Sequence, residues 1–208
     1  GKGETDDHTW AWVPSKKTLV TGDLVIWVFP NAGNPQKVQR YPLEWASALR
    51  QMISYDAELL LPAHGLPISG KDRIRRVLSD IADVLEALVS DTVALMNGGA
   101  SLNEIIHEVK VDEDKLGLPW LQPLYDEPEF VVRNIWRMYG GWWDADPASL
   151  KPSPQSDLAS ELVSLVGGVS PLVSRAQELA ENGDFRLSCH LIEFAANAEP
   201  ENKKVHGV

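Results

Sequence analysis

The sequence lacks the features of several protein classes, beginning with cysteine. A single cysteine, Cys189, among 208 residues excludes an internal disulfide framework and suits a reducing compartment. No run reaches the about 18 apolar residues of a membrane-spanning helix. Basic residues are scarce, since 19 Lys and Arg against 30 Asp and Glu give a formal net charge of −11. Binding to nucleic acid or to an anionic membrane surface needs a basic face, so the composition argues against both.

The chain also lacks an initiator methionine, because it begins at Gly1. No strands precede its first apolar segment, and we therefore expect the chain to be the second part of a longer domain. A chain without its natural N-terminus would have lost any signal peptide. A cytoplasmic and a periplasmic location therefore both stay open.

The first 70 residues carry an α/β pattern. The alternating segment Thr9–Pro14 and the apolar segment Thr18–Gly22 are predicted strands. A helix is predicted over Leu43–Ser54, where apolar residues recur every three positions, and a short buried strand over Glu58–Leu61, stopped by Pro62. Strand, loop, helix and strand in this order are typical of α/β folds, in which ligands bind at the carboxyl ends of strands.

After Gly70 the pattern becomes helical. Apolar residues three or four positions apart predict one long helix over Asp72–Met96, and SLNE at Ser101 has the pattern of a capping box. Further helices are predicted over Glu129–Tyr139 and, as a group of three, within 156–200. The last two resemble a tetratricopeptide-type hairpin, which cannot bury its own face and is expected to dock on other helices or on a partner chain. We therefore predict two domains, residues 1–70 and 71–208.

Two metal-capable side chains follow the predicted strands. Asp23 lies in TGD and His64 lies in PAHG. Parallel strands bring their carboxyl ends to the same edge of a sheet, so the two side chains are expected to converge. A carboxylate can bridge two cations, and an imidazole is a common zinc ligand. Two alternatives stay open, namely that Asp23 only caps a turn and that His64 is structural.

A third carboxylate, Glu4, lies in GETDDH before the first predicted strand. The chain between Glu4 and Asp23 is long enough for one β-hairpin that brings both to the same end. The alternative is a solvated acidic terminus. Eight tryptophans are many for this length. They belong to a core of large residues, or some of them line an apolar substrate channel or a subunit interface.

Together, GETDDH, TGD and PAHG resemble the last three metal motifs of the metallo-β-lactamase superfamily. The resemblance implies that Glu4, Asp23 and His64 are zinc ligands, and that Asp23 bridges two zinc ions and acts in catalysis. A glutamate at position 4, where most members have histidine, resembles the alkyl sulfatase branch. The segment Tyr125–Pro152 (YDEPEFVVRNIWRMYGGWWDADPASLKP) is similar to the alkyl sulfatase dimerisation domain, which implies a homodimer.

The sequence departs from this family pattern in three places. The motif HxHxDH, which supplies most metal ligands in the superfamily, does not occur in the 208 residues. Asp23 stands where alkyl sulfatases usually have glutamate. No histidine occurs around Phe130–Asn134, where the family has one near the sulfate. The sulfate-ester assignment is therefore weaker than the assignment to metallohydrolases.

The resemblance implies an α/β fold class, a partial metallo-β-lactamase-type αββα domain, followed by an all-α dimerisation domain. The expected function is a binuclear zinc-dependent hydrolase, with two zinc ions in the complete protein, in which a metal-activated hydroxide attacks an ester such as a sulfate ester of a hydrophobic alcohol. The fragment alone is expected to be inactive. The alternative is a non-catalytic helical dimerisation or scaffold module that carries a degenerate hydrolase remnant.

The loop after the Asp23 strand offers donors to the anionic group of such a substrate. The four candidate substrate-binding residues are Asn31, Asn34, Lys37 and Arg40. Ordinary loop polarity is the alternative explanation for these side chains.

Overall fold

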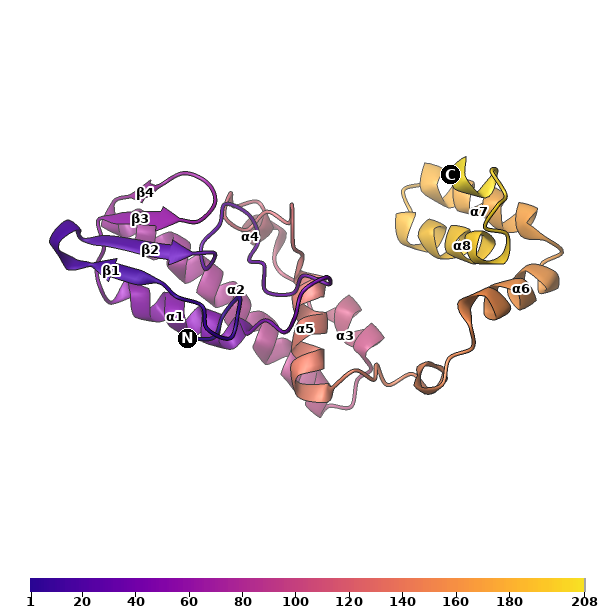
Figure 1. Ribbon diagram of the computed structural model, residues 1–208, viewed down its shortest axis with the longest axis horizontal. Helices are drawn as coiled ribbons and strands as arrows, with labels where there is room; N and C mark the ends of the chain where they lie inside the picture. Colours follow the sequence, from indigo (N-terminus) through magenta and orange to yellow (C-terminus); the bar gives the residue numbers. More distant parts are fainter. Residues whose placement is uncertain (208) are drawn as a thin grey trace. The chain divides into compact units, whose positions relative to one another are not determined.

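The computed structural model describes residues 1–207 (Figure 1). Its contacts divide the chain into two compact units, Gly1–Asp146 and Pro147–Val208. The first unit contains a small sheet and five helices among the described residues. Its elements are β1 (Ala11–Val13), β2 (Thr18–Gly22), α1 (Pro42–Ile53), β3 (Leu59–Pro62), β4 (Ile68–Ser69), α2 (Lys71–Asn97), α3 (Leu102–Glu108), α4 (Glu113–Leu116) and α5 (Pro128–Gly140).

The sheet has the strand order β1-β2-β3-β4. Strands β1 and β2 form an antiparallel hairpin in which Ala11 lies opposite Val20. Strands β2 and β3 are parallel, with Leu19 opposite Leu60, and α1 connects them. The predicted strands and the predicted helix between them are therefore confirmed. The parallel pairing places the residues that follow β2 and β3 at one edge of the sheet.

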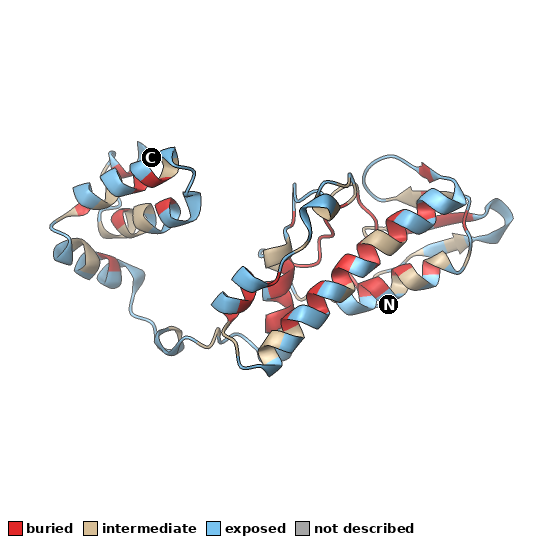
Figure 2. Cartoon of the chain, turned by 180° about the vertical axis from the view of Figure 1, so that it is seen from behind, coloured by how far each residue is buried: buried red, intermediate tan, exposed pale blue. Residues whose placement is uncertain are grey.

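The core of the first unit lies between the sheet and the helices. Trp45 of α1 is fully buried, and its indole nitrogen donates a hydrogen bond to the carbonyl oxygen of Leu24 at 2.9 Å. Buried residues form a stripe along α2 (Figure 2) that includes Leu78, Ile81 and Leu85. Because α2 packs against α1, the apolar core runs across residue 70 without a break. The division into the domains 1–70 and 71–208 stays a prediction.

The segment 29–35 is irregular, as its proline, asparagine and glycine residues predict. The backbone N–H of Phe29 donates to the carbonyl oxygen of Gln122 at 2.8 Å. Gly33 lies so close to α5 that an added Cβ would be 2.1 Å from the backbone nitrogen of Val131. A larger residue at this position would push the loop away from the helix. Gly33 therefore allows the loop to lie against α5.

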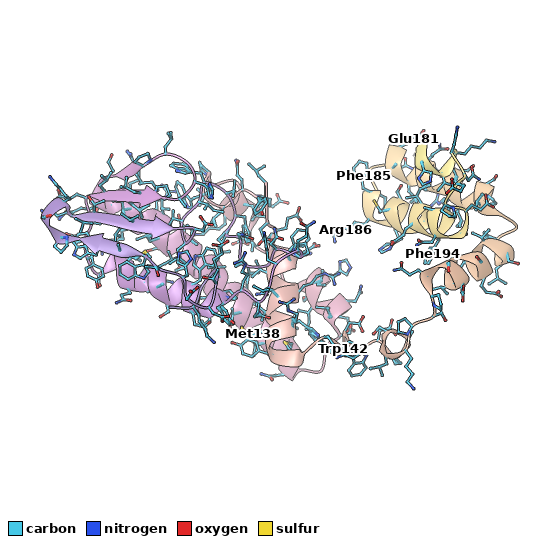
Figure 3. All side chains as sticks on the ribbon, in the orientation of Figure 1. Met138, Trp142, Glu181, Phe185, Arg186 and Phe194 are labelled. Carbon is cyan, nitrogen blue, oxygen red and sulfur yellow. The ribbon has the colours of Figure 1, made fainter. Side chains whose placement is uncertain are left out.

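The described part of the second unit contains three α-helices, as predicted: α6 (Gln155–Leu165), α7 (Val169–Glu181) and α8 (Phe185–Ala198). Its buried core is small: Val169, Ala195 and Val205 form one cluster, and Ala159, Ala176 and Leu179 are also buried. The hydroxyl of Ser188 in α8 donates to the carbonyl oxygen of Ala176 in α7 at 2.8 Å. Phe185 begins α8 (Figure 3) and is exposed. This unit therefore holds together with little buried apolar area.

The mixed α/β fold class is confirmed in its coarse form, a small sheet with mostly helices, whereas the finer αββα layout stays a prediction. Two short elements, β4 and α4, were not predicted by the sequence pattern. No helix in residues 1–207 combines the length and the apolar character needed to cross a membrane.

Candidate active site

A cavity of about 520 Å³ lies where β2 and β3 end. The turn after β2 provides Asp23, and the turn after β3 provides His64. Glu4, from the segment before β1, also lines the cavity, so the β1–β2 hairpin brings Glu4 and Asp23 to the same end of the sheet, as predicted. The three predicted metal ligands therefore border one cavity.

Asp23 and His64 form a close pair. The Nε2 atom of His64 lies 3.4 Å from Oδ1 of Asp23. The backbone joins the two turns directly, because the N–H of Ala63 donates to the carbonyl oxygen of Gly22 at 3.2 Å. The imidazole is 74% exposed and the aspartate is 31% exposed, so both are accessible from the cavity. An oxygen donor and a nitrogen donor are thus available to one ligand.

Glu4 lies in a polar network instead of a solvated terminus. Its Oε1 atom accepts hydrogen bonds from Asn31 Nδ2 at 3.2 Å and is 3.2 Å from Nη2 of Arg40. Arg40 also donates to the backbone carbonyl of Glu4, and its side chain is only 5% exposed. His8 Nδ1 lies 4.0 Å from the other oxygen of Glu4. Arg40 and Asn31 therefore fix the position of this carboxylate.

The pKa of Glu4 lies above its usual value. Burial is the main cause, and a hydrogen bond to Asp23 together with its negative charge raises the pKa further. Arg40 and His8 partly offset this rise. A cation bound beside two carboxyl groups that share a hydrogen bond would stabilise the ionised form of both groups.

The donors present fit part of a metal site. Two carboxylates and one imidazole are zinc-compatible ligands. The buried Oδ1 atom of Asn31 has no hydrogen-bond partner, so the wall of the cavity keeps a free acceptor. Within residues 1–207, however, no group of three His, Cys, Asp or Glu side chains is arranged to hold a metal ion by itself. Further ligands are therefore needed to complete a metal site at Asp23 and His64.

The cavity also has apolar and aromatic lining residues that sequence reasoning did not single out. They are Ile26, Trp27, Val28 and Tyr125. The indole of Trp27 lies directly over Gly65, where an added Cβ would be 1.7 Å from its Cδ1 atom. The Trp27 Nε1 atom also donates to the carbonyl oxygen of Leu66 at 2.7 Å. Trp27 thereby holds the turn that carries His64, and at least this tryptophan lines the cavity.

The four predicted substrate-binding residues do not all meet. Asn31, Lys37 and Arg40 line the cavity, whereas Asn34 lies in a separate hollow against α5. Asn31 and Arg40 are occupied by Glu4, as described above. Lys37 has no ion-pair partner among the described residues. A second unpredicted neighbour is His8, whose Nε2 lies 3.2 Å from the carbonyl oxygen of Thr21. The sequence signal that could have revealed His8 is its place in GETDDH, beside Glu4.

Comparisons with known proteins place this geometry in a family context. The family model described as "Alkyl sulfatase dimerisation" matches residues 101–208. The chain is 27% identical to a linear primary-alkylsulfatase of a Pseudomonas species over 96% of its own length and 38% of that protein. It is also 27% identical to an (R)-specific secondary-alkylsulfatase of a Pseudomonas species over 92% of the chain and 30% of that protein.

A solved structure gives the same result. The stereoselective inverting sec-alkylsulfatase Pisa1 from a Pseudomonas species matches with a TM-score of 0.88 and 26% identity, over 98% of this chain and 33% of that protein. The chain therefore spans well under half the length of the relatives it matches.

Proposed function

The chain belongs to the alkyl sulfatase dimerisation family, and we propose that it forms one wall of the active site of a metal-dependent hydrolase that cleaves sulfate esters. The observation that carries this proposal is the cavity at the ends of β2 and β3, where Glu4, Asp23 and His64 meet cationic and apolar side chains. The relatives, which are alkylsulfatases, support the sulfate-ester class. The proposed protein is longer than these 208 residues, as its relatives are.

Metal binding is assigned to Asp23, His64 and Glu4. Zinc, when bound, would lower the pKa of water and polarise an ester oxygen, and two ions are expected in the complete protein. The sequence contains no HxHxDH motif, so the remaining ligands would come from residues other than these. The proximity of the Asp23 and His64 donor atoms supports this assignment.

Substrate binding is assigned to the charged and the apolar residues that line the cavity. The ammonium group of Lys37 lacks an ion-pair partner among residues 1–207 and would bind the sulfate group through charged hydrogen bonds. Ile26, Trp27, Val28 and Tyr125 would bury the alkyl group. A sulfate ester of a hydrophobic alcohol contains both an anionic sulfate group and an apolar alkyl group.

Arg40 would act as a positioning residue. Its guanidinium is buried and is already bound to the side chain and backbone of Glu4. A buried charge of this kind is stable only with its partner, so Arg40 would hold Glu4 toward the cavity. This leaves Lys37 as the cation that is free to bind substrate.

A homodimer through residues 101–208 is the proposed assembly, because the matching family model describes a dimerisation domain. A second candidate function is a non-catalytic dimerisation module. It is favoured by the fact that the matched region excludes Glu4, Asp23 and His64. In residues 1–207 no three-ligand group is found either.

The deciding experiment measures zinc content and sulfate release from dodecyl sulfate for the protein as its source makes it, and for His64→Ala and Asp23→Asn variants. We expect loss of zinc and a fall in sulfate release of about a hundredfold or more in both variants, because each removes a ligand. His107→Ala, at an exposed histidine of α3, is the matched control and should behave as the wild type.

Two results would contradict the proposal. Unchanged zinc content and activity in His64→Ala would show that His64 is not a ligand. A protein of 23.0 kDa per subunit that forms dimers, binds no zinc and releases no sulfate would instead support the non-catalytic module.

A further inference from the structure

A second hollow, of about 220 Å³, lies between the loop 33–37 and helix α5. It is separate from the cavity described above, and Lys37 lines both. One face of α5 forms its wall, because Phe130, Arg133, Asn134 and Arg137 are three or four residues apart. On the scale of about 30 Å³ for each water in the liquid, the hollow has room for a small anion and several waters.

The charge of the hollow is opposite to that of the chain. Its lining contains Lys37, Arg133 and Arg137 but no aspartate or glutamate, whereas the whole chain has a net charge of −11. None of these three cations forms an ion pair among residues 1–207. Some cations elsewhere in the described chain, among them Arg50 and Lys71, are paired with carboxylates. The hollow therefore has a local excess of unneutralised positive charge.

The side-chain polar groups that remain free in the hollow are donors. Arg137 uses Nε to donate to Gln39 Oε1 at 3.2 Å, which leaves its two terminal nitrogens. The Oδ1 atom of Asn34 accepts from the backbone N–H of Gln36 at 3.0 Å, which leaves its amide nitrogen. Lys37 and Arg133 can only donate. A ligand for this hollow must therefore supply acceptors and negative charge.

The wall of the hollow is fixed by hydrogen bonds. The Nε2 atom of Gln39 donates to Oδ1 of Asn134 at 3.0 Å, and Asn134 in turn donates to the carbonyl oxygen of Arg40 at 2.9 Å. Asn134 and its bond to the carbonyl oxygen of Arg40 are buried, whereas the bond between Gln39 and Arg137 is exposed to solvent. Gln39, fixed by Asn134, thus orients the guanidinium of Arg137 before any ligand binds. Such preorganisation lowers the entropic cost of binding.

From this arrangement we infer that the hollow binds a tetrahedral oxyanion, of the class of inorganic sulfate or phosphate, through Lys37, Arg133 and Arg137. Guanidinium groups match the oxygen spacing of such anions, and the charges make the hydrogen bonds strong. The choice of sulfate as the natural ligand rests on the proposed function, whose reaction would release sulfate. Lys37 then connects the place of reaction with a place where the product, or the head of the next substrate, is held.

The test is an amide NMR titration of the isotopically labelled 208-residue chain after treatment with a chelator. Sodium sulfate and sodium phosphate are added separately, at an ionic strength kept constant with sodium chloride. We expect saturable shifts at residues 33–37 and 130–137, and affinity about tenfold weaker in the double variant Arg133→Ala/Arg137→Ala. Arg73→Ala/Arg75→Ala, on the exposed face of α2, is the control with the same change of charge.

Several outcomes would overturn the inference. These are shifts that do not saturate, shifts confined to the cavity around Trp27 and Gly65, and equal weakening by the α2 control. Binding of phosphate without sulfate would keep the site and reject sulfate as its ligand. The titration uses neither substrate nor metal, so a failure of sulfate-ester hydrolysis and a failure of anion binding are distinguishable.

Discussion

Asp126 is an acidic residue with no exposed surface. Its carboxyl oxygens accept hydrogen bonds from the backbone N–H groups of Gly33 at 2.8 Å and Glu127 at 2.9 Å. Burial raises its pKa from 3.8 to about 6, although these hydrogen bonds and Arg40 oppose the rise. Asp126 thereby joins the start of α5 to the loop that borders both the cavity and the hollow.

This raised pKa predicts how stability changes with pH. The folded chain binds the Asp126 proton more tightly than the unfolded chain between pH 4 and pH 6. The contribution of Asp126 to the free energy of unfolding is therefore largest below pH 4, falls as the pH rises through about 6, and is constant above that. The total change is about 3 kcal/mol.

An Asp126→Asn variant isolates this effect, because the amide does not titrate. Urea titrations at pH 4, 5, 6 and 7 measure the free energy of unfolding of both proteins. The stability of the wild type relative to the variant should fall as the pH rises. Asp114→Asn, at an exposed position of α4, should show no such trend. A constant difference for Asp126→Asn across this range would mean that Asp126 does not bind its proton in the folded state.

Some residues of the candidate site could be predicted from the sequence, and others could not. Asp23 and His64 were predictable because a parallel strand pair forces the residues after its strands together. Asn34 was expected beside them, but the close approach of Gly33 to α5 places Asn34 in the other hollow. No spacing rule contains that contact, since it joins residues about a hundred positions apart. Trp27 was equally hidden, because its partner is the bare backbone at Gly65.

Helix α3 is the element with the clearest start signal. The hydroxyl of Ser101 accepts from the backbone N–H of Glu104 at 3.3 Å, and the Glu104 carboxylate accepts from the Ser101 N–H at 2.7 Å. The backbone N–H and the hydroxyl of Ser101 both donate to the Glu104 carboxylate and lower its pKa. The predicted capping box is therefore confirmed.

Removing this cap should destabilise the chain. Ser101→Ala loses the side-chain acceptor of the box, and we expect the free energy of unfolding to fall by about 1 kcal/mol. Ser90→Ala is the matched control, because Ser90 is an exposed residue within α2 where alanine is a better helix former. Chemical denaturation measures both. Equal stability of the two variants would show that the cap contributes nothing.

The length of a helix or strand decides whether its sequence pattern can predict it. Helix α2 was predicted to within one residue at each end, because its apolar stripe repeats over many turns. Strand β4 has two residues and α4 has four, which is too short for any period to appear. Strand β4 pairs with β3, and Ile68 lies opposite Leu60 and Ser69 opposite Leu59. Such elements depend on tertiary contacts that local sequence does not encode.

At the scale of the whole molecule, the two units have cores of very different size. The first unit buries a continuous apolar core, whereas the buried apolar residues described in the second unit are few and mostly small: Ala159, Val169, Ala176, Leu179, Ala195 and Val205. Less buried apolar surface means lower local stability. Large apolar side chains of the second unit are also exposed, among them Leu165 and Phe185 at 74% and 65%. A second copy of the chain would cover such surface in the proposed homodimer.

The proposed dimer makes the stability of the second unit depend on protein concentration. At low concentration, the amide hydrogens of α7 and α8 should exchange with solvent well before those of α2. If α6, α7 and α8 form the interface, raising the concentration to about a hundred times the dissociation constant should slow their exchange, by an amount equivalent to about 2.7 kcal/mol.

Hydrogen exchange read by mass spectrometry on dilute and concentrated samples distinguishes the possibilities. Helix α2 is the internal control, because its buried stripe packs within its own unit and should not respond. If protection rises instead along the exposed end of α5, around Tyr139 and Trp142, the dimer forms through the other unit. If it rises nowhere while the mass remains 23.0 kDa, the chain is monomeric and the proposed homodimer is wrong.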